Sequence, residues 1–135
     1  MRIIWIKSVP KLVLDLLYIY KINLLGDNKM RYPYELKKDP FGITRIKLPE
    51  KIAVFSDVFE DISTREEADE YIGYVQKVLE GAYENFEITL NATSLLLRKN
   101  TTIAEHHYRV EEPFKCTIET DEFLELILIW KETIV

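Results

Sequence analysis

The sequence predicts an α+β fold in which an antiparallel sheet packs against helices. Three observations predict it: a doubled helix-capping motif followed by apolar residues at helical spacing, several short segments in which apolar and polar residues alternate, and prolines that separate extended segments near residue 40. The chain has 135 residues and a hydrophobic content of 47%, which suffices for the core of one domain. The element order expected over residues 30–135 is β-β-α-β-β-β-β-α.

The first two strands are expected at residues 43–48 and 51–55, because both are rich in apolar β-branched residues and lie among turn residues. The first helix is expected to begin at Ser63 or Thr64, each of which has a glutamate three residues later. Apolar residues then recur at helical spacing and form one face, which consists of Ala68, Tyr71, Ile72, Val75, Leu79 and Ala82.

Four further strands and a terminal helix complete the predicted fold. The strands are expected at residues 86–90, 95–98, 103–110 and 114–118. In the last of them Phe114, Cys116 and Ile118 share one face, because side chains alternate along a strand. Thr120 is expected to cap the final helix, whose first turn carries two acidic residues near the positive end of the helix dipole.

Residues 1–29 are mostly apolar and allow two interpretations. They can form a strand and a buried helix of the same domain. Alternatively they are a translated leader, because codons for Gly26-Asp27 can contain a bacterial ribosome-binding sequence shortly before Met30, which would then be the native start. A membrane span is not expected, since it needs about 20 nearly uncharged residues. The apolar stretch is interrupted by Lys7, Pro10, Lys11, Asp15 and Lys21.

Charge is distributed unevenly along the chain. Residues 1–51 contain eleven basic and five acidic side chains, whereas residues 52–135 contain seven basic and eighteen acidic ones. The first part therefore has a net charge of +6 and the second a net charge of −11. Such an acidic field repels nucleic acid and anionic membranes, and it attracts a basic protein surface.

The densest acidic run spans residues 57–70, where Arg65 is the one basic residue. This run can be an ordinary solvated helix face. It can also be a binding surface, because it begins ahead of the predicted helix and apolar residues alternate with the acids, as in interfaces that combine steering charge with an aromatic anchor. Phe59 is the expected anchor. The residues expected to contact a partner are Asp57, Phe59, Glu60, Asp61, Glu66, Glu67 and Glu70.

The sequence offers no clear set of catalytic residues, metal ligands or cofactor-binding residues, so we do not expect an enzyme. His106 and His107 are adjacent on a predicted strand and should point to opposite faces of the sheet, with His106 inward and His107 outward. Cys116 is expected in the core rather than in a reactive site. As the single cysteine it cannot form an internal disulfide, which fits a reducing cytoplasm.

The chain resembles the small acidic immunity proteins of bacterial polymorphic and contact-dependent toxin systems. The likeness covers roughly residues 30–135 and lies in a small acidic α+β domain that ends with a strand running into a terminal helix, here residues 114–130. It implies a cytoplasmic protein that binds one cognate toxin, often a nuclease, and blocks its active site. A nuclease is basic because its substrate is a polyanion, so an acidic inhibitor can occupy the same surface.

A second class of function stays open beside this one. The same acidic face can serve a generic cytosolic adaptor or assembly subunit, or the chain can form a homodimer through an exposed Phe59. In each of these cases the partner is a protein rather than a nucleic acid or a membrane.

Overall fold

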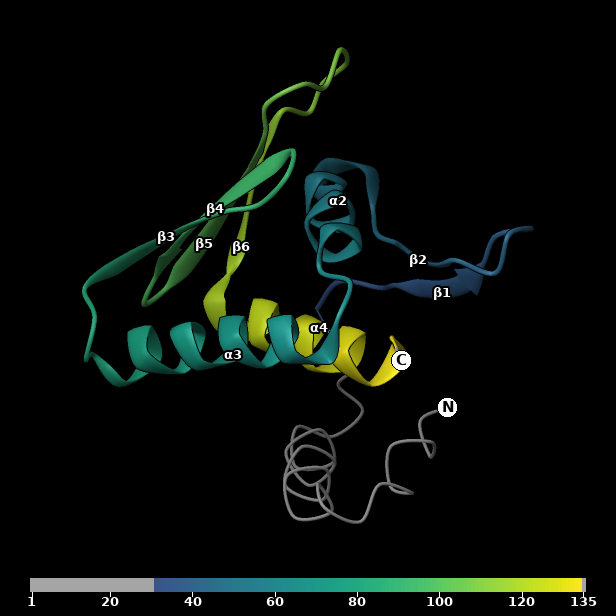
Figure 1. The fold of residues 1–135 in the computed structure, drawn as a ribbon. Coiled ribbons are helices and arrows are strands. Elements are labelled where there is room, and N and C mark those ends of the chain that lie inside the picture. The colour runs from purple at the N-terminus through teal and green to yellow at the C-terminus, as the bar shows by residue number, and fades with distance from the viewer. Residues whose placement is uncertain (1–30, 135) are drawn as a thin grey trace. The chain divides into compact units, whose positions relative to one another are not determined.

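The computed structural model describes residues 31–134 and confirms the α+β fold (Figure 1). The main sheet is antiparallel, with the strand order β3-β4-β5-β6, and its strands are Asn85–Thr89, Thr93–Arg98, Thr101–His106 and Lys115–Glu119. A separate hairpin pairs β1 (Glu35–Lys38) with β2 (Thr44–Lys47). The helices of the described residues are the 3-10 helix η3 (Glu50–Ile52), α2 (Val54–Asp61), α3 (Arg65–Glu80) and α4 (Thr120–Thr133).

The helices cover one face of the main sheet. The register places Ile88, Leu95, Ala104 and Cys116 in one row across the four strands, and all four are buried. Their neighbours Leu97 and Ile118 are buried on the same face. The helices α2, α3 and α4 all contact the sheet, and α3 also packs along α4 (Figure 1). The core therefore lies between this face and the three helices.

The helix α3 forms as the sequence predicts. The Thr64 hydroxyl accepts a hydrogen bond from the Glu67 backbone N–H, and the Glu67 carboxylate accepts one from the Ser63 N–H. These contacts satisfy N–H groups that the first turn of a helix leaves without partners. The helix ends at Gly81, whose φ of 88° is left-handed, a conformation that glycine adopts without strain.

The prediction of a strand at residues 51–55 is wrong, because this segment forms η3 and the start of α2. Its β-branched residues suggest a strand, but the buried residues Ile52, Phe55, Phe59 and Ile62 recur every three or four positions, which is the helical period. The first strand is instead Glu35–Lys38, which pairs with β2 through the turn at Gly42. The helix α2 is thus the element that the prediction missed.

Two smaller predictions are also corrected. Strand β5 ends at His106 rather than Val110, so Tyr108 and Val110 are not strand residues, and both are exposed. Thr120 is the first residue of α4 rather than its cap. The buried Thr120 hydroxyl instead contacts the hydroxyl of Thr102 on β5 and donates to the Arg98 carbonyl oxygen.

The expected apolar segment at residues 1–29 lies outside the described residues. Among residues 31–134, no helix is both long enough and apolar enough to span a membrane.

Candidate functional site

The seven residues expected to bind a partner are divided between two helices. Asp57, Phe59, Glu60 and Asp61 lie on α2, and Glu66, Glu67 and Glu70 lie on α3. The two groups have different surroundings, so each is described in turn.

Phe59 is not available to a partner. Its side chain is 0% exposed and stacks on Phe123 of α4, with ring centroids 5.5 Å apart. The helical spacing of α2 explains this, because Phe59 lies one turn after the buried Phe55 and therefore on the same, sheet-facing side of the helix. The expectation of an exposed aromatic anchor at Phe59 is wrong, and so is a homodimer through this ring.

The opposite side of α2 forms the floor of a surface groove. The groove has a volume of about 330 Å³ and lies between strand β2 and the loop that joins β5 to β6. Its lining residues come from β2 and the segment after it, from α2, and from that loop: Ile46, Lys47, Leu48, Glu50, Ala53, Ser56, Asp57, Glu60 and Arg109. We refer to it below as the α2 groove. Asp57 and Glu60 therefore line the same groove, and their contact with a partner stays a prediction.

Glu60 is held firmly in this groove. Its carboxylate accepts hydrogen bonds from the Arg45 guanidinium and from the Ile46 backbone N–H, both at 3.2 Å. Arg45 also forms an ion pair with Asp39, at 3.3 Å. Burial raises the pKa of the Glu60 carboxyl, and the bonds from Ile46 and Arg45 oppose that rise. Glu60 thus joins the β1–β2 hairpin to α2.

Asp57 is less well satisfied. Its nearest basic side chains in the described residues are the Arg109 guanidinium at 3.7 Å and the His106 ring at 3.8 Å, and within residues 31–134 its carboxylate accepts no hydrogen bond. The Arg109 Nη1 atom is itself buried and finds no hydrogen-bond acceptor in the described part of the chain. Burial raises the pKa of the Asp57 carboxyl, although the nearby Arg109 charge opposes that rise. The groove therefore contains a carboxylate that is 37% exposed and that no side chain of residues 31–134 contacts at hydrogen-bond distance.

Exposed apolar side chains lie in the hairpin turn and in the β5–β6 loop, the two segments that flank the α2 groove, although none of them lines it. Phe41 and Ile43 lie at the turn of the β1–β2 hairpin, where Phe41 is 86% exposed. Tyr108 and Val110 lie in the β5–β6 loop beside Arg109 and are 74% and 88% exposed. Exposed apolar side chains on neighbouring surface segments can serve as contacts for a protein partner. Their position beside a carboxylate-containing groove is typical of a protein-binding surface.

Asp61 has a structural role at the end of α2. Its carboxylate accepts hydrogen bonds from the Ala92 backbone N–H and from the hydroxyl of the buried Thr93, both at 3.3 Å. These contacts fix the turn between β3 and β4 against the helix. Asp61 is therefore less available for a partner than Asp57.

The acidic residues of α3 form a second cluster with tyrosines. The Tyr71 hydroxyl donates to Glu67 at 3.1 Å, and the Tyr74 hydroxyl donates to Glu70 at 2.6 Å. Burial and the bond to Glu67 raise the pKa of Tyr71 to about 12. Glu66 and Glu70 are exposed. This helix face carries negative charge toward solvent without forming a groove.

Sequence reasoning missed the residues that turn Asp57 and Glu60 into a site. Arg45 and Arg109 meet α2 only through tertiary contacts, and no local pattern marks either one. Tyr108 and Val110 carried a usable signal, since they precede Glu111-Glu112-Pro113, a polar segment typical of a loop. A predicted strand that ended before these two residues would have placed both of them in an exposed loop.

The histidines and the cysteine lie as expected. His106 pairs with Thr93 on the helix-covered face, whereas the exposed His107 contacts Ser94 at 3.1 Å. Cys116 is buried, and burial raises the pKa of its thiol, which keeps it in the unreactive protonated form. Within residues 31–134, no group of three His, Cys, Asp or Glu side chains is placed to hold a metal ion.

Comparison of the chain with protein-family models, with curated proteins and with solved structures finds no match.

Proposed function

We propose that the chain is a cytoplasmic immunity protein, which binds a basic bacterial toxin domain, a nuclease, and neutralises it by covering its active-site surface. The proposal assigns binding to the α2 groove and requires no catalysis by this chain. The α3 acids contribute long-range attraction, because complementary charge accelerates the encounter of two proteins.

The carboxylate of Asp57 is the observation that carries this proposal. The Asp57 side chain is 37% exposed and so accessible to a partner, and the nearest basic side chains of residues 31–134, Arg109 and His106, lie beyond hydrogen-bond distance of its carboxylate. A lysine or arginine of a partner would supply the missing donor with a charge-assisted hydrogen bond. A basic toxin surface that binds phosphates is rich in such side chains.

The exposed apolar side chains of the β5–β6 loop and of the hairpin turn add the second component of a stable complex. Tight interfaces combine a small number of desolvated anchors with surrounding charge, and the anchors contribute most of the binding free energy. Tyr108 and Val110, which flank the groove residue Arg109 in the chain, can supply this apolar contact while Asp57 binds a cation of the partner. The aromatic anchor that the sequence placed at Phe59 is thus replaced by side chains on the two loops.

Neutralisation of the protein encoded by the adjacent gene tests this proposal. That protein is produced in bacteria together with the wild-type chain, with Asp57→Lys or with Glu84→Lys, and growth and complex formation are measured. Glu84→Lys is the matched control, because Glu84 is an exposed acid after α3 and is not among the residues that line the groove. We expect growth arrest by the toxin, protection by wild type and by Glu84→Lys, and loss of both binding and protection with Asp57→Lys.

Two outcomes would contradict the proposal. Full protection by Asp57→Lys would show that the α2 groove is not the binding site. A complex with a partner that does not inhibit growth would show that the chain is an adaptor rather than an immunity protein.

A further inference from the structure

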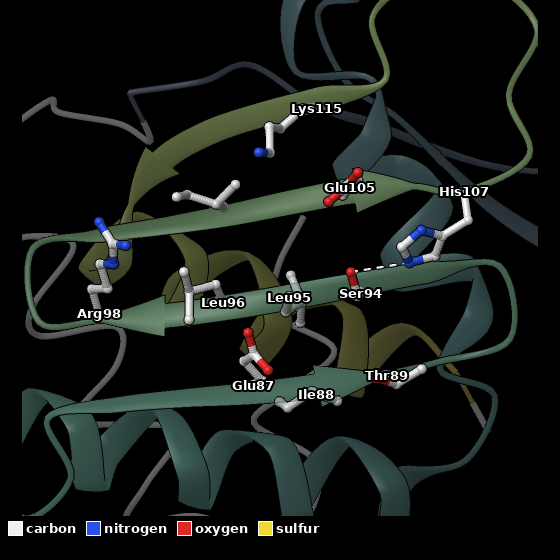
Figure 2. Close-up of a pocket in the computed structure, with 11 residues that line it drawn as sticks. Glu87, Ile88, Thr89, Ser94, Leu95, Leu96, Arg98, Glu105, His107 and Lys115 are labelled. Atoms are coloured by element: carbon white, nitrogen blue, oxygen red, sulfur yellow. Dashed lines mark hydrogen bonds between the residues drawn. The ribbon is translucent and has the colours of Figure 1, made fainter.

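The face of the main sheet opposite the helices is open. Figure 2 shows the side chains of this face standing on β3, β4, β5 and β6, with a shallow hollow of about 400 Å³ among them. The register forms two rows across the strands, Glu87-Leu96-Ile103-Thr117 and Thr89-Ser94-Glu105-Lys115. The alternation of side chains that buries the opposite rows under the helices leaves these rows outward.

Leu96 and Ile103 form an apolar centre on this face. They are directly opposite each other on β4 and β5, and both are only partly buried. Two adjacent aliphatic side chains at the middle of an open sheet face gain free energy when another apolar surface covers them.

Charged side chains of both signs surround this centre. Glu87 and Glu105 are acidic, Arg98 and Lys115 are basic, and within residues 31–134 none of the four forms an ion pair. In Figure 2 they stand around Leu96, with Arg98 at one end of β4 and Lys115 on β6. The face is therefore electrically balanced, although residues 52–135 as a whole have a net charge of −11.

This balance indicates what kind of surface can cover the face. A strongly basic protein is attracted to the acidic groove and to α3, and it gains little from a face that carries equal numbers of acids and bases. Two copies of this acidic chain repel each other over most of their surface, but their open faces can approach, since the acids of one copy can meet the bases of the other. An interface between identical faces must be self-complementary in this way.

We propose that the open face of the β3-β4-β5-β6 sheet is a homodimer interface. Leu96 and Ile103 of the two copies form its centre, and Glu87 and Glu105 of each copy pair with Arg98 and Lys115 of the other. Four strands about 4.8 Å apart and five residues long give a face of roughly 19 by 17 Å. Two such faces bury roughly 650 Å² together, which is less than the ~1,000 Å² of a stable specific interface, so we expect a weak, reversible dimer.

Analytical ultracentrifugation of the full chain, from low to high micromolar concentration, tests the proposal without any toxin. We expect wild type to dimerise and Leu96→Glu to weaken dimerisation at least ~10-fold, because a charge replaces the apolar centre. The sharper test uses two charge-reversed variants. Glu87→Lys/Glu105→Lys makes the face basic, and Arg98→Glu/Lys115→Glu makes it acidic.

Each charge-reversed variant should be monomeric alone, and an equimolar mixture of the two should form a heterodimer. Glu80→Lys/Glu84→Lys is the matched control, which changes the same number of exposed acids outside this face and should leave dimerisation unchanged. Circular dichroism confirms that each variant is folded. A wild type that stays monomeric at all concentrations, a dimer that survives Leu96→Glu, or a mixture that does not associate would overturn the proposal. Because no toxin is present, these results are independent of the proposed function.

Discussion

Replacement of Phe59 by alanine separates a core role from a binding role. The Phe59 ring is fully buried against Phe123, and Phe55 also packs on Phe123, with ring centroids 5.8 Å apart. Phe59→Ala removes one ring of this group and leaves a cavity between α2 and α4, which typically costs about 3–5 kcal/mol of unfolding free energy. A domain of this size has roughly 5–15 kcal/mol in total. We therefore expect a loss of about a fifth of its stability or more.

Urea unfolding of the full chain, followed by circular dichroism, measures this loss. The midpoint should fall while the slope of the transition stays unchanged, because the surface exposed on unfolding is nearly the same. Phe59→Leu keeps most of the side-chain volume and should cost less than about 1.5 kcal/mol. If Phe59→Ala lowers the unfolding free energy by less than about 1 kcal/mol, the ring has no core role, because substitutions of exposed side chains have effects of that size.

Three further substitutions test individual contacts. Asp57→Asn should raise stability at pH 7 by less than about 1 kcal/mol, because burial raises the pKa of Asp57 and so penalises its ionised form in the folded state. This gain in stability should vanish as the pH falls toward about 4, where the Asp57 carboxyl also binds a proton in the unfolded chain. A melting temperature that is lower for Asp57→Asn than for wild type at pH 7 would contradict the prediction. Asp61→Ala removes both hydrogen bonds to the β3–β4 turn and should cost about 1–3 kcal/mol in urea unfolding, and no change would show that the turn does not need them. Trp130→Phe leaves the buried Ile62 carbonyl without the indole N–H that donates to it at 2.9 Å, so a cost of about 1–3 kcal/mol is expected in the same assay, and an unchanged midpoint would argue against this bond.

The parts of the fold that sequence reasoning predicted well are those specified locally. The helix α3 follows from its capping residues and its apolar spacing, both of which are contained within one segment. The strands of the main sheet follow from alternation, as in β3, where Ile88 is buried while Glu87 and Thr89 are exposed. Their pairing in sequence order follows from the short turns between them.

The helix α2 was missed because two local signals conflict there. Residues 51–55 have the composition of a strand, whereas the apolar spacing that continues to Ile62 has the period of a helix. The segment forms a helix because only the helical period buries Phe55, Phe59 and Ile62 together on one side. A window that ended at Phe55 could not show this.

The candidate site was predicted in part, for a related reason. The charge run correctly marks Asp57 and Glu60 as neighbours, but the sequence does not show that Arg109 and the β5–β6 loop close the other side of the groove. Such contacts join residues about fifty positions apart. An exposed aromatic anchor was expected on α2, while the exposed apolar side chains are on the loops beside it.

The most direct test of the central claim is to map the surface that the partner covers. Amide hydrogen exchange of the full chain, measured by mass spectrometry with and without the toxin domain encoded by the adjacent gene, locates that surface. Our account predicts slower exchange in α2, in the β1–β2 hairpin and in the β5–β6 loop around Arg109, with the open face of the main sheet unchanged. Protection confined to other segments, with α2 and the two loops unaffected in a stable complex, would contradict it.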